Sequence, residues 1–267
     1  MIETDLENTS ARVDSYAMNA YLRYKFNENF SVHGGLRLET AKGEITLGDS
    51  YGAAAGYNVQ LGADTALGYS AGVAYERKDI ALRVVLTYHS AITHDFSSTE
   101  TFAISPDPMV PAGFPLPGET SVDTPEAFNL DFQTGIAENT LLFGGVRYAL
   151  WGDFDVIPQF LGSDLADLGD STTYRLGVAR RFSDTFAASV SFTYEEEGDP
   201  LVSPLAPSNG QLGVSIGGQY TMDNLVLSAG INYTDIGDAN PQLSDTAFAD
   251  FTDNSAFGWG LKIGYTF

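Results

Sequence analysis

The chain has 267 residues, with 35 Asp and Glu against 13 Lys and Arg, a formal net charge of −22 and no cysteine. These values exclude disulfides and thiolate metal sites, and they argue against a nucleic-acid partner, which needs clustered Lys and Arg to neutralise phosphates. The sequence also lacks the run of about 18 apolar residues that a transmembrane helix requires.

Apolar and polar residues alternate with period two in one segment after another, beginning with YAMNAYLRYKF at residues 16–26. Tyr16, Met18 and Leu22 share one face of this segment, and Asn19 and Arg23 share the other. The pattern is typical of a strand with one apolar face. It predicts about eleven strands, at residues 13–26, 30–45, 65–77, 80–92, 126–136, 139–151, 172–182, 186–196, 210–222, 224–235 and 255–267.

Short and long connections alternate between the predicted strands. The short ones are tight polar turns, at residues 27–29, 77–79, 137–139, 183–185 and 222–224. The long ones hold much of the negative charge, at residues 46–64, 93–125, 152–171, 197–209 and 236–254, and YNVQLGA in the first could hide a further short strand. This connectivity is typical of an outer-membrane barrel, which has short periplasmic turns and long external loops.

A soluble β-sandwich or a lipocalin-like barrel would also show alternation. The predicted strands, however, run to about 11–14 residues, longer than is usual in globular sheets. Aromatic residues also lie near both ends of the apolar faces, as in the girdles of membrane barrels. We therefore expect residues 1–267 to form a single all-β domain, an antiparallel transmembrane β-barrel in the bacterial outer membrane, present as a monomer.

The final segment, WGLKIGYTF, alternates up to Phe267 and follows a long loop, which predicts a periplasmic C-terminus. Bacterial single-chain barrels have an even number of strands. With eleven strands counted, we expect at least one strand to precede Met1. The acidic start, MIETDLENTS, lacks the basic and apolar regions of a signal peptide.

Three segments together resemble the FadL-type (OMPP1/FadL/TodX) outer-membrane transporters of long-chain fatty acids and aromatic hydrocarbons. Residues 124–158 contain LWGDF, similar to an aromatic–Trp–Ser–x–Phe motif with Gly152 in place of Ser. Residues 30–45, FSVHGGLRLETAKGEI, resemble another strand of that family, and so do residues 86–98, LTYHSAITHDFSS, with His89 where Arg is common. The aromatic C-terminus is similar too.

The resemblance implies a barrel of fourteen strands with an N-terminal hatch inside it, so this chain would lack the hatch and about three strands. It implies contacts with outer-membrane lipids and lipopolysaccharide, and with the insertion machinery that reads a terminal Phe. It also implies a basic substrate-site residue at Lys42. Strict alternation points Lys42 outward, so a bulge beside Gly43 would be needed to turn it inward.

Signals for catalysis, cofactors or metals are poor. The three histidines are His33, His89 and His94. His89 and His94 differ by five, so on a regular strand they face opposite sides and cannot share a metal. No nucleophile-elbow or phosphate-loop motif occurs. We expect no enzyme, cofactor or metal site.

If the apolar faces contact lipid, several basic side chains face the lumen, namely Arg23, Arg37, Arg83, His89, Arg147, Arg175 and Lys262. They either form an ion-pair network with Glu39, Asp131 and Glu195 or supply one or two anchors for a carboxylate. The apolar loop at residues 106–118, with Phe114 and Leu116, either packs on itself or offers a landing site for lipophilic molecules. Our candidate substrate residues are thus Lys42, Arg37, Arg83, Arg147, Phe114 and Leu116.

The sequence therefore predicts passive uptake of hydrophobic compounds through a barrel. A general diffusion porin, or a structural barrel, is the first alternative. A barrel lipase with a Ser–His pair is the second, although no serine is singled out.

Overall fold

The computed structural model describes residues 2–3, 8–105, 107–203, 208–243, 246–247 and 250–265. Its main element is a 14-stranded antiparallel sheet. The bounds of its strands are β1 (Ile2–Glu3), β2 (Ser10–Lys25), β3 (Phe30–Thr46), β4 (Asn58–Arg77), β5 (Leu82–His89), β6 (Thr93–Thr101), β7 (Leu116–Asp123), β8 (Ala127–Ala137), β9 (Thr140–Ala149), β10 (Ser171–Arg181), β11 (Phe186–Glu195), β13 (Gln211–Met222), β14 (Leu225–Ile236) and β17 (Asn254–Tyr265).

The remaining elements lie in the connections. Three 3₁₀ helices are η1 (Asp49–Ala54), η2 (Lys78–Ile80) and η3 (Trp151–Asp153). Among the described residues, none of them is long and apolar enough to cross a membrane. A separate small sheet consists of β12 (Leu201–Val202), β15 (Asn240–Leu243) and β16 (Thr246–Ala247). It joins two connections, 197–209 and 236–254, that the sequence predicted to be loops.

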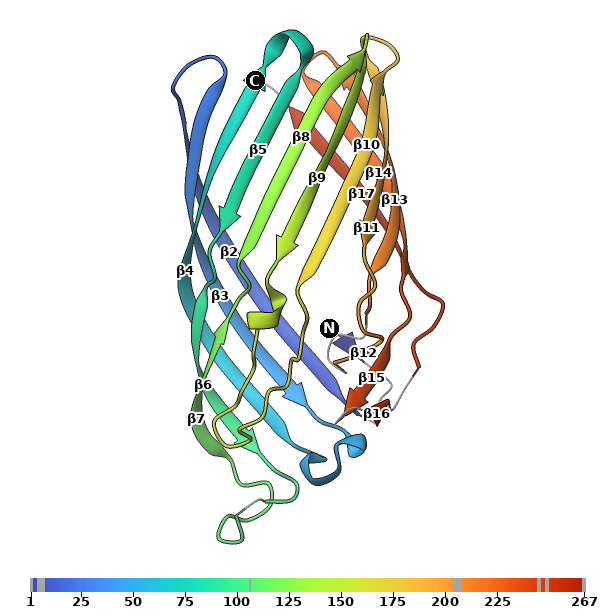
Figure 1. Ribbon diagram of the computed structural model, residues 1–267. Helices are drawn as coiled ribbons and strands as arrows, with labels where there is room; N and C mark the ends of the chain where they lie inside the picture. Colours follow the sequence, from blue (N-terminus) through green and yellow to red (C-terminus); the bar gives the residue numbers. More distant parts are fainter. Residues whose placement is uncertain are drawn as a thin grey trace.

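The large sheet curls around a central lumen (Figure 1). After β1, its order is β2-β3-β4-β5-β8-β9-β10-β11-β13-β14-β17, which is the predicted eleven strands in chain order. The short turns gather at one rim, where β17 also ends beside the start of β14, because Tyr265 pairs with Leu225. The long connections gather at the opposite rim. The predicted barrel fold with alternating short and long connections is therefore confirmed.

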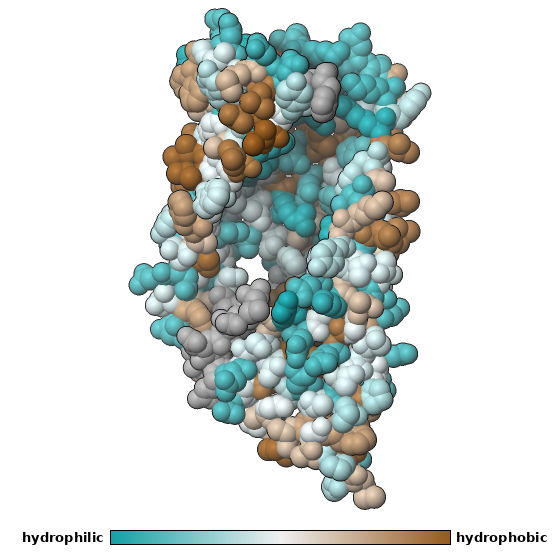
Figure 2. All heavy atoms as spheres, turned by 180° about the vertical axis from the view of Figure 1, so that it is seen from behind, coloured by the Kyte–Doolittle hydropathy of each residue, from teal (hydrophilic) through white to brown (hydrophobic). Residues whose placement is uncertain are grey.

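The outer face of the wall is apolar. Leu22 of β2 is 84% exposed and Trp259 of β17 is 78% exposed, as is expected of side chains that contact lipid. Aromatic side chains mark both edges of this band: Tyr88 packs on Phe128 at 5.1 Å toward the long-loop rim, and Phe30 packs on Tyr75 at 4.9 Å toward the other. Viewed from behind, the molecule is hollow between two flanks that carry hydrophobic patches, with hydrophilic residues inside (Figure 2).

The lumen face differs between the two halves of the wall. From β2 to β9 it carries charged and polar side chains, because the register places Arg37, Asn129 and Arg147 on the face opposite the apolar band. From β10 to β17 it carries mainly small residues, which share a face through the register and include Gly177, Ser191, Ser215, Gly230 and Gly260.

Two neighbouring strands are interrupted at the same level, which the sequence did not predict. β5 ends at His89 and β6 begins at Thr93, while β7 ends at Asp123 and β8 begins at Ala127. β4 pairs with β5 along one part of its length and with β6 along another. The predicted strand at 80–92 is therefore too long, and the predicted loop at 93–125 contains a β-hairpin, β6–β7. Conversely, YNVQLGA (57–63) contains the start of β4, at Asn58.

Side-chain hydroxyls hold this interruption together. Ser90 Oγ accepts a hydrogen bond from the Tyr69 amide at 2.9 Å, and Thr124 Oγ1 accepts one from the Ile92 amide at 3.0 Å. The Ile92 side chain is buried, and it lies where a Cβ on Gly68 would be only 2.6 Å away. The break is thus a packed structure with its backbone groups bonded.

The long-loop end of the lumen is filled on one side by an apolar core. Its buried members come from β3, β4, β6 and β7 and from the segment after η3, and include Ile45, Val59, Phe96, Val122, Val156 and Ala166. The connection at 152–171, predicted as an external loop, therefore packs against the inner face of the wall. Glu100 of β6 fixes it there by accepting hydrogen bonds from the amides of Phe160 and Leu161 at 3.0 and 2.9 Å.

Candidate ligand-binding lumen

A cavity of about 560 Å³, which we call the large cavity, lies inside the wall at the level of the strand interruption. Its lining includes Ser90 and Ile92 from one break and Thr124 and Pro125 from the other. Three basic side chains line it as well, namely Arg37, His89 and Arg147. The break therefore lies beside two lumen arginines and a histidine.

The cations in this cavity differ in how they are paired. Arg37 forms an ion pair with Glu39, donating from Nε at 2.7 Å. Arg147 donates from Nη1 to the amide oxygen of Asn129 at 2.9 Å, and Asn129 Nδ2 lies 3.2 Å from His89 Nε2. Among the described residues, no carboxylate lies within ion-pair distance of Arg147. Arg147 thus keeps guanidinium donors and a net positive charge available inside the lumen.

An apolar wall faces these cations. Trp151 of η3 and Phe154 both line the cavity, with their rings edge to face at 5.6 Å. Asp170 holds the turn that places them, because it accepts hydrogen bonds from the Tyr148 hydroxyl at 2.6 Å and the Gly152 amide at 2.9 Å. The hydrogen bond from the Tyr148 hydroxyl and, to a smaller extent, the one from the Gly152 amide lower the pKa of Asp170. The cavity therefore combines a free cation with an aromatic surface.

A second, smaller pocket of about 130 Å³ adjoins this cavity. The two share Val13, Glu39, Thr124 and Phe154 in their linings. The small pocket extends toward the apolar core and is enclosed mainly by aliphatic and aromatic side chains. A ligand in the large cavity thus has an apolar side pocket next to it.

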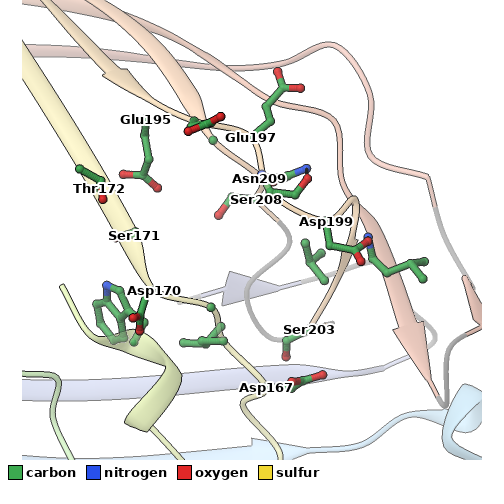
Figure 3. A pocket seen from close by; sticks show the side chains of 18 residues that line it. Asp167, Asp170, Ser171, Thr172, Glu195, Glu197, Asp199, Ser203, Ser208 and Asn209 are labelled. Atoms are coloured by element: carbon green, nitrogen blue, oxygen red, sulfur yellow. Dashed lines mark hydrogen bonds between the residues drawn. The ribbon is translucent and has the colours of Figure 1, made fainter. Parts of the chain in front are cut away.

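A third cavity, of about 630 Å³, is acidic (Figure 3) and shares Trp151 with the lining of the first. Glu195 projects from the end of one strand, Asp170 lies before β10, and Asp167 and Asp199 lie farther along the rim (Figure 3). The carboxylates are spread around the cavity, and among the described residues no group of three His, Cys, Asp or Glu could hold a metal ion. It is best described as an acidic vestibule.

The structure brings together two of the six candidate substrate residues, since Arg37 and Arg147 line one cavity. Arg83 lies toward the short-turn rim, where its Nε is 3.3 Å from Glu76, which also pairs with Arg23. Arg83 and Arg23 are thus ion-paired, but their partner is Glu76 and not one of the three carboxylates that the sequence suggested.

Lys42 remains on the outer face. A register shift does occur between Ala41 and Gly43, but its extra residue lies in β4, so the alternation of β3 is unbroken. Lys42 pairs directly with Asp14 across the sheet, and its Nζ lies 3.7 Å from that carboxylate. The bulge that the resemblance required is present, yet it does not turn Lys42 inward.

The predicted apolar loop lies at the long-loop rim. Its first residue, Pro106, falls outside the described residues. Phe114 is 52% exposed, whereas Leu116 begins β7 and packs against the apolar core. Within the described part of this loop, Met109 and Phe114 are therefore the large apolar side chains that are exposed.

Sequence reasoning missed Glu100, Trp151, Phe154 and His94 as residues that shape the lumen. The expectation that His89 and His94 face opposite sides was wrong, because the interruption between β5 and β6 reverses the alternation. His89 lines the large cavity, and His94 lines the small pocket. The Ser and Thr residues that cap the break, Ser90 and Thr124, were the available signal.

Comparisons with known proteins agree with this architecture. A family model described as "Outer membrane protein transport protein (OMPP1/FadL/TodX)" matches residues 4–267. No curated protein sequence matches the chain. A FadL homologue from Pseudomonas aeruginosa has a similar structure, with a TM-score of 0.73 at 15% identity, covering 95% of this chain and 66% of that one.

Two transporters of known structure are similar as well. The toluene transporter TodX of Pseudomonas putida gives a TM-score of 0.57 at 15% identity, covering 87% of this chain and 66% of its own. The toluene transporter TbuX of Ralstonia pickettii gives 0.61 at 12% identity, covering 88% and 68%. At such identities the likeness concerns the fold, and this chain spans about two thirds of the length of these relatives.

Proposed function

Because the chain belongs to the OMPP1/FadL/TodX family of outer-membrane transport proteins, we propose that it takes up hydrophobic compounds passively through its lumen. The candidates are long-chain fatty acids and aromatic hydrocarbons, and the solved relatives include two toluene transporters. The observation that carries the proposal is the large cavity, where Trp151 and Phe154 face Arg147. Aromatic walls with a few polar groups are what a site for an amphipathic small molecule requires.

The path that we propose begins at the long-loop rim. Ile104, Met109 and Phe114 expose apolar surface there, at 63, 88 and 52%. An exposed apolar patch on an external loop suits first contact with a lipophilic molecule. From there the molecule moves to the large cavity, and each transfer is driven by burial of apolar area at about 25 cal/mol per Å².

Arg147 gives this cavity a preference among hydrophobic molecules. A guanidinium without a carboxylate partner can bind a carboxylate head group through paired, charge-assisted hydrogen bonds. A fatty acid would place its carboxylate at Arg147 and its chain along Trp151. A neutral hydrocarbon would use only the apolar wall.

A general diffusion porin is the alternative, and the small residues that line the lumen from β10 to β17 favour it. The two functions separate in proteoliposomes made with the chain. We expect uptake of labelled oleate or toluene, with slow swelling in sugar solutions. Rapid permeation of sugars without uptake of either hydrophobic compound would contradict our proposal.

A further inference from the structure

The small pocket beside the large cavity has the size of one aromatic ring. Its volume is about 130 Å³, and its apolar lining comes from β2, β3, β4, β6, β7 and the segment after η3, with Val13, Ile45, Leu61, Phe96, Val122 and Phe154. Dry apolar cavities of about 150 Å³ bind benzene in proteins. The pocket can therefore hold one ring, and it is too small for a long acyl chain.

One buried polar atom in this pocket has no partner. His94 is 1% exposed, and its ring stacks on Phe96 with centroids 5.4 Å apart. Its Nδ1 lies 3.0 Å from Asp64 Oδ2, which fixes the orientation of the imidazole. Its Nε2 is buried and has no hydrogen-bond partner among the residues that the structure describes. Leaving such an atom unpaired is costly, so a ligand that bonds to it gains accordingly.

A carboxylate oxygen lies near this nitrogen. Glu39 Oε1 is 3.8 Å from His94 Nε2, too far for a direct hydrogen bond. The other oxygen of Glu39 is already bonded by Arg37 Nε at 2.7 Å. A single hydroxyl oxygen fits between the two atoms at about 2.8 Å from each. It bonds both atoms when it accepts from the N–H of Nε2 and donates its own proton to Glu39 Oε1.

We propose that this pocket binds a hydroxylated single-ring aromatic molecule of the phenol class, with its hydroxyl between His94 Nε2 and Glu39 Oε1. The inference rests on the proposed uptake of hydrophobic compounds and names one class among them. Discrimination follows from the chemistry of the pocket. Toluene has nearly the shape of phenol but leaves both polar atoms unpaired, and a site built around a hydroxyl discriminates against the analogue that lacks it.

The first test compares phenol and toluene binding to the full chain in detergent micelles. We take the ratio of the two dissociation constants, toluene over phenol, so that partition into detergent cancels between variants. His94→Leu removes the bonding nitrogen at similar volume and should lower this ratio about threefold to tenfold, the range of one hydrogen bond. His33→Leu changes a lumen histidine outside the pocket and should leave the ratio unchanged. An unchanged ratio in folded His94→Leu overturns the proposal.

The second test needs no substitution in the pocket. The chain has three histidines, so ¹⁵N-histidine labelling yields a simple spectrum. The signals that are missing in folded His94→Leu identify the His94 imidazole. Phenol should shift the Nε2 resonance of this imidazole, and toluene should not. If saturating phenol shifts no histidine in the unmodified chain, the proposal is wrong even if His94→Leu does not fold.

These binding measurements are independent of transport. Phenol binding at His94 without uptake of any hydrophobic compound into proteoliposomes would contradict the proposed function and leave the pocket assignment intact. Uptake of oleate or toluene without phenol binding would support the proposed function and contradict the pocket assignment.

Discussion

The carboxylate of Glu100 lies 2.8 Å from the hydroxyl of Tyr57, and both side chains are fully buried at the long-loop end of the lumen. The same carboxylate accepts the amides of Phe160 and Leu161. Burial first, and then the hydrogen bond to Glu100, raise the pKa of Tyr57. The Glu100 side chain therefore joins β6 to the residue that precedes β4 and to the segment that narrows the lumen.

Glu100→Ala should loosen this segment. The substitution leaves the buried Tyr57 hydroxyl and two partly buried amides without an acceptor, which costs about 3 kcal/mol of unfolding free energy. We expect a lower midpoint in urea unfolding from detergent, and faster protease cleavage between residues 154 and 168. Glu138→Gln, in an exposed turn at the short-turn rim, serves as the control. Unchanged stability and cleavage in Glu100→Ala would show that the apolar core alone holds the segment.

The eleven strands were predictable because period-two alternation follows directly from a wall with lipid on one side and a lumen on the other. The turns were predictable because Asn139 and Asp223 adopt positive φ values of 55° and 42°, which these residue types tolerate. The interruption after His89 was not, because the residues that form it, such as Ile92, also suit a continuing strand. Its cause is tertiary: Ser90 and Thr124 bond to backbone groups that are distant in sequence.

The site was predictable only in part for the same reason. Alternation placed Arg37 and Arg147 in the lumen, but not their proximity, which depends on the sheet order. Lys42 could not be settled from its own strand, because the extra residue of the bulge lies in β4. His94 was assigned to the wrong face because alternation was carried through the break.

Asp170 should control the position of Trp151 in a pH-dependent way. Its pKa is lowered in the folded state, so its contribution to stability is present above the usual aspartate pKa of about 4 and is lost as the pH falls through the lowered value. In a Trp259→Phe background, Trp151 is the only remaining tryptophan. We expect its fluorescence to change in acid, with a midpoint below about 4.

The control for this titration is Asp155→Asn, an exposed carboxyl on the same segment, which should keep the acid transition. Asp170→Asn should remove it and show altered fluorescence at neutral pH. If Asp170→Asn titrates like the parent, another group controls the turn.

Arg147→Gln should reduce binding of anionic hydrophobic molecules selectively. Loss of a charge-assisted hydrogen bond in a partly exposed site should weaken oleate binding about tenfold. Binding of toluene, which has no charge, should stay the same. Oleate binding is measured by competition against a fluorescent fatty acid. Toluene binding is measured by direct partition of labelled toluene. Arg175→Gln, whose guanidinium lies 3.6 Å from Asp131, is the matched lumen control. Equal losses for oleate and toluene would indicate a structural role for Arg147.

Lys42→Gln should leave uptake unchanged, because the Lys42 ammonium lies beside Asp14 on the outer face, although the residue also borders the small pocket. Its ion pair is 3.7 Å long and partly exposed, and surface pairs of this kind contribute about 0–1 kcal/mol. We expect oleate affinity within about twofold of the parent chain, against the tenfold loss in Arg147→Gln. Both variants are compared in the same competition assay, with urea unfolding to confirm that each is folded. A loss in Lys42→Gln as large as that in Arg147→Gln would require β3 to rotate its face on ligand binding. It would also restore Lys42 as a substrate residue.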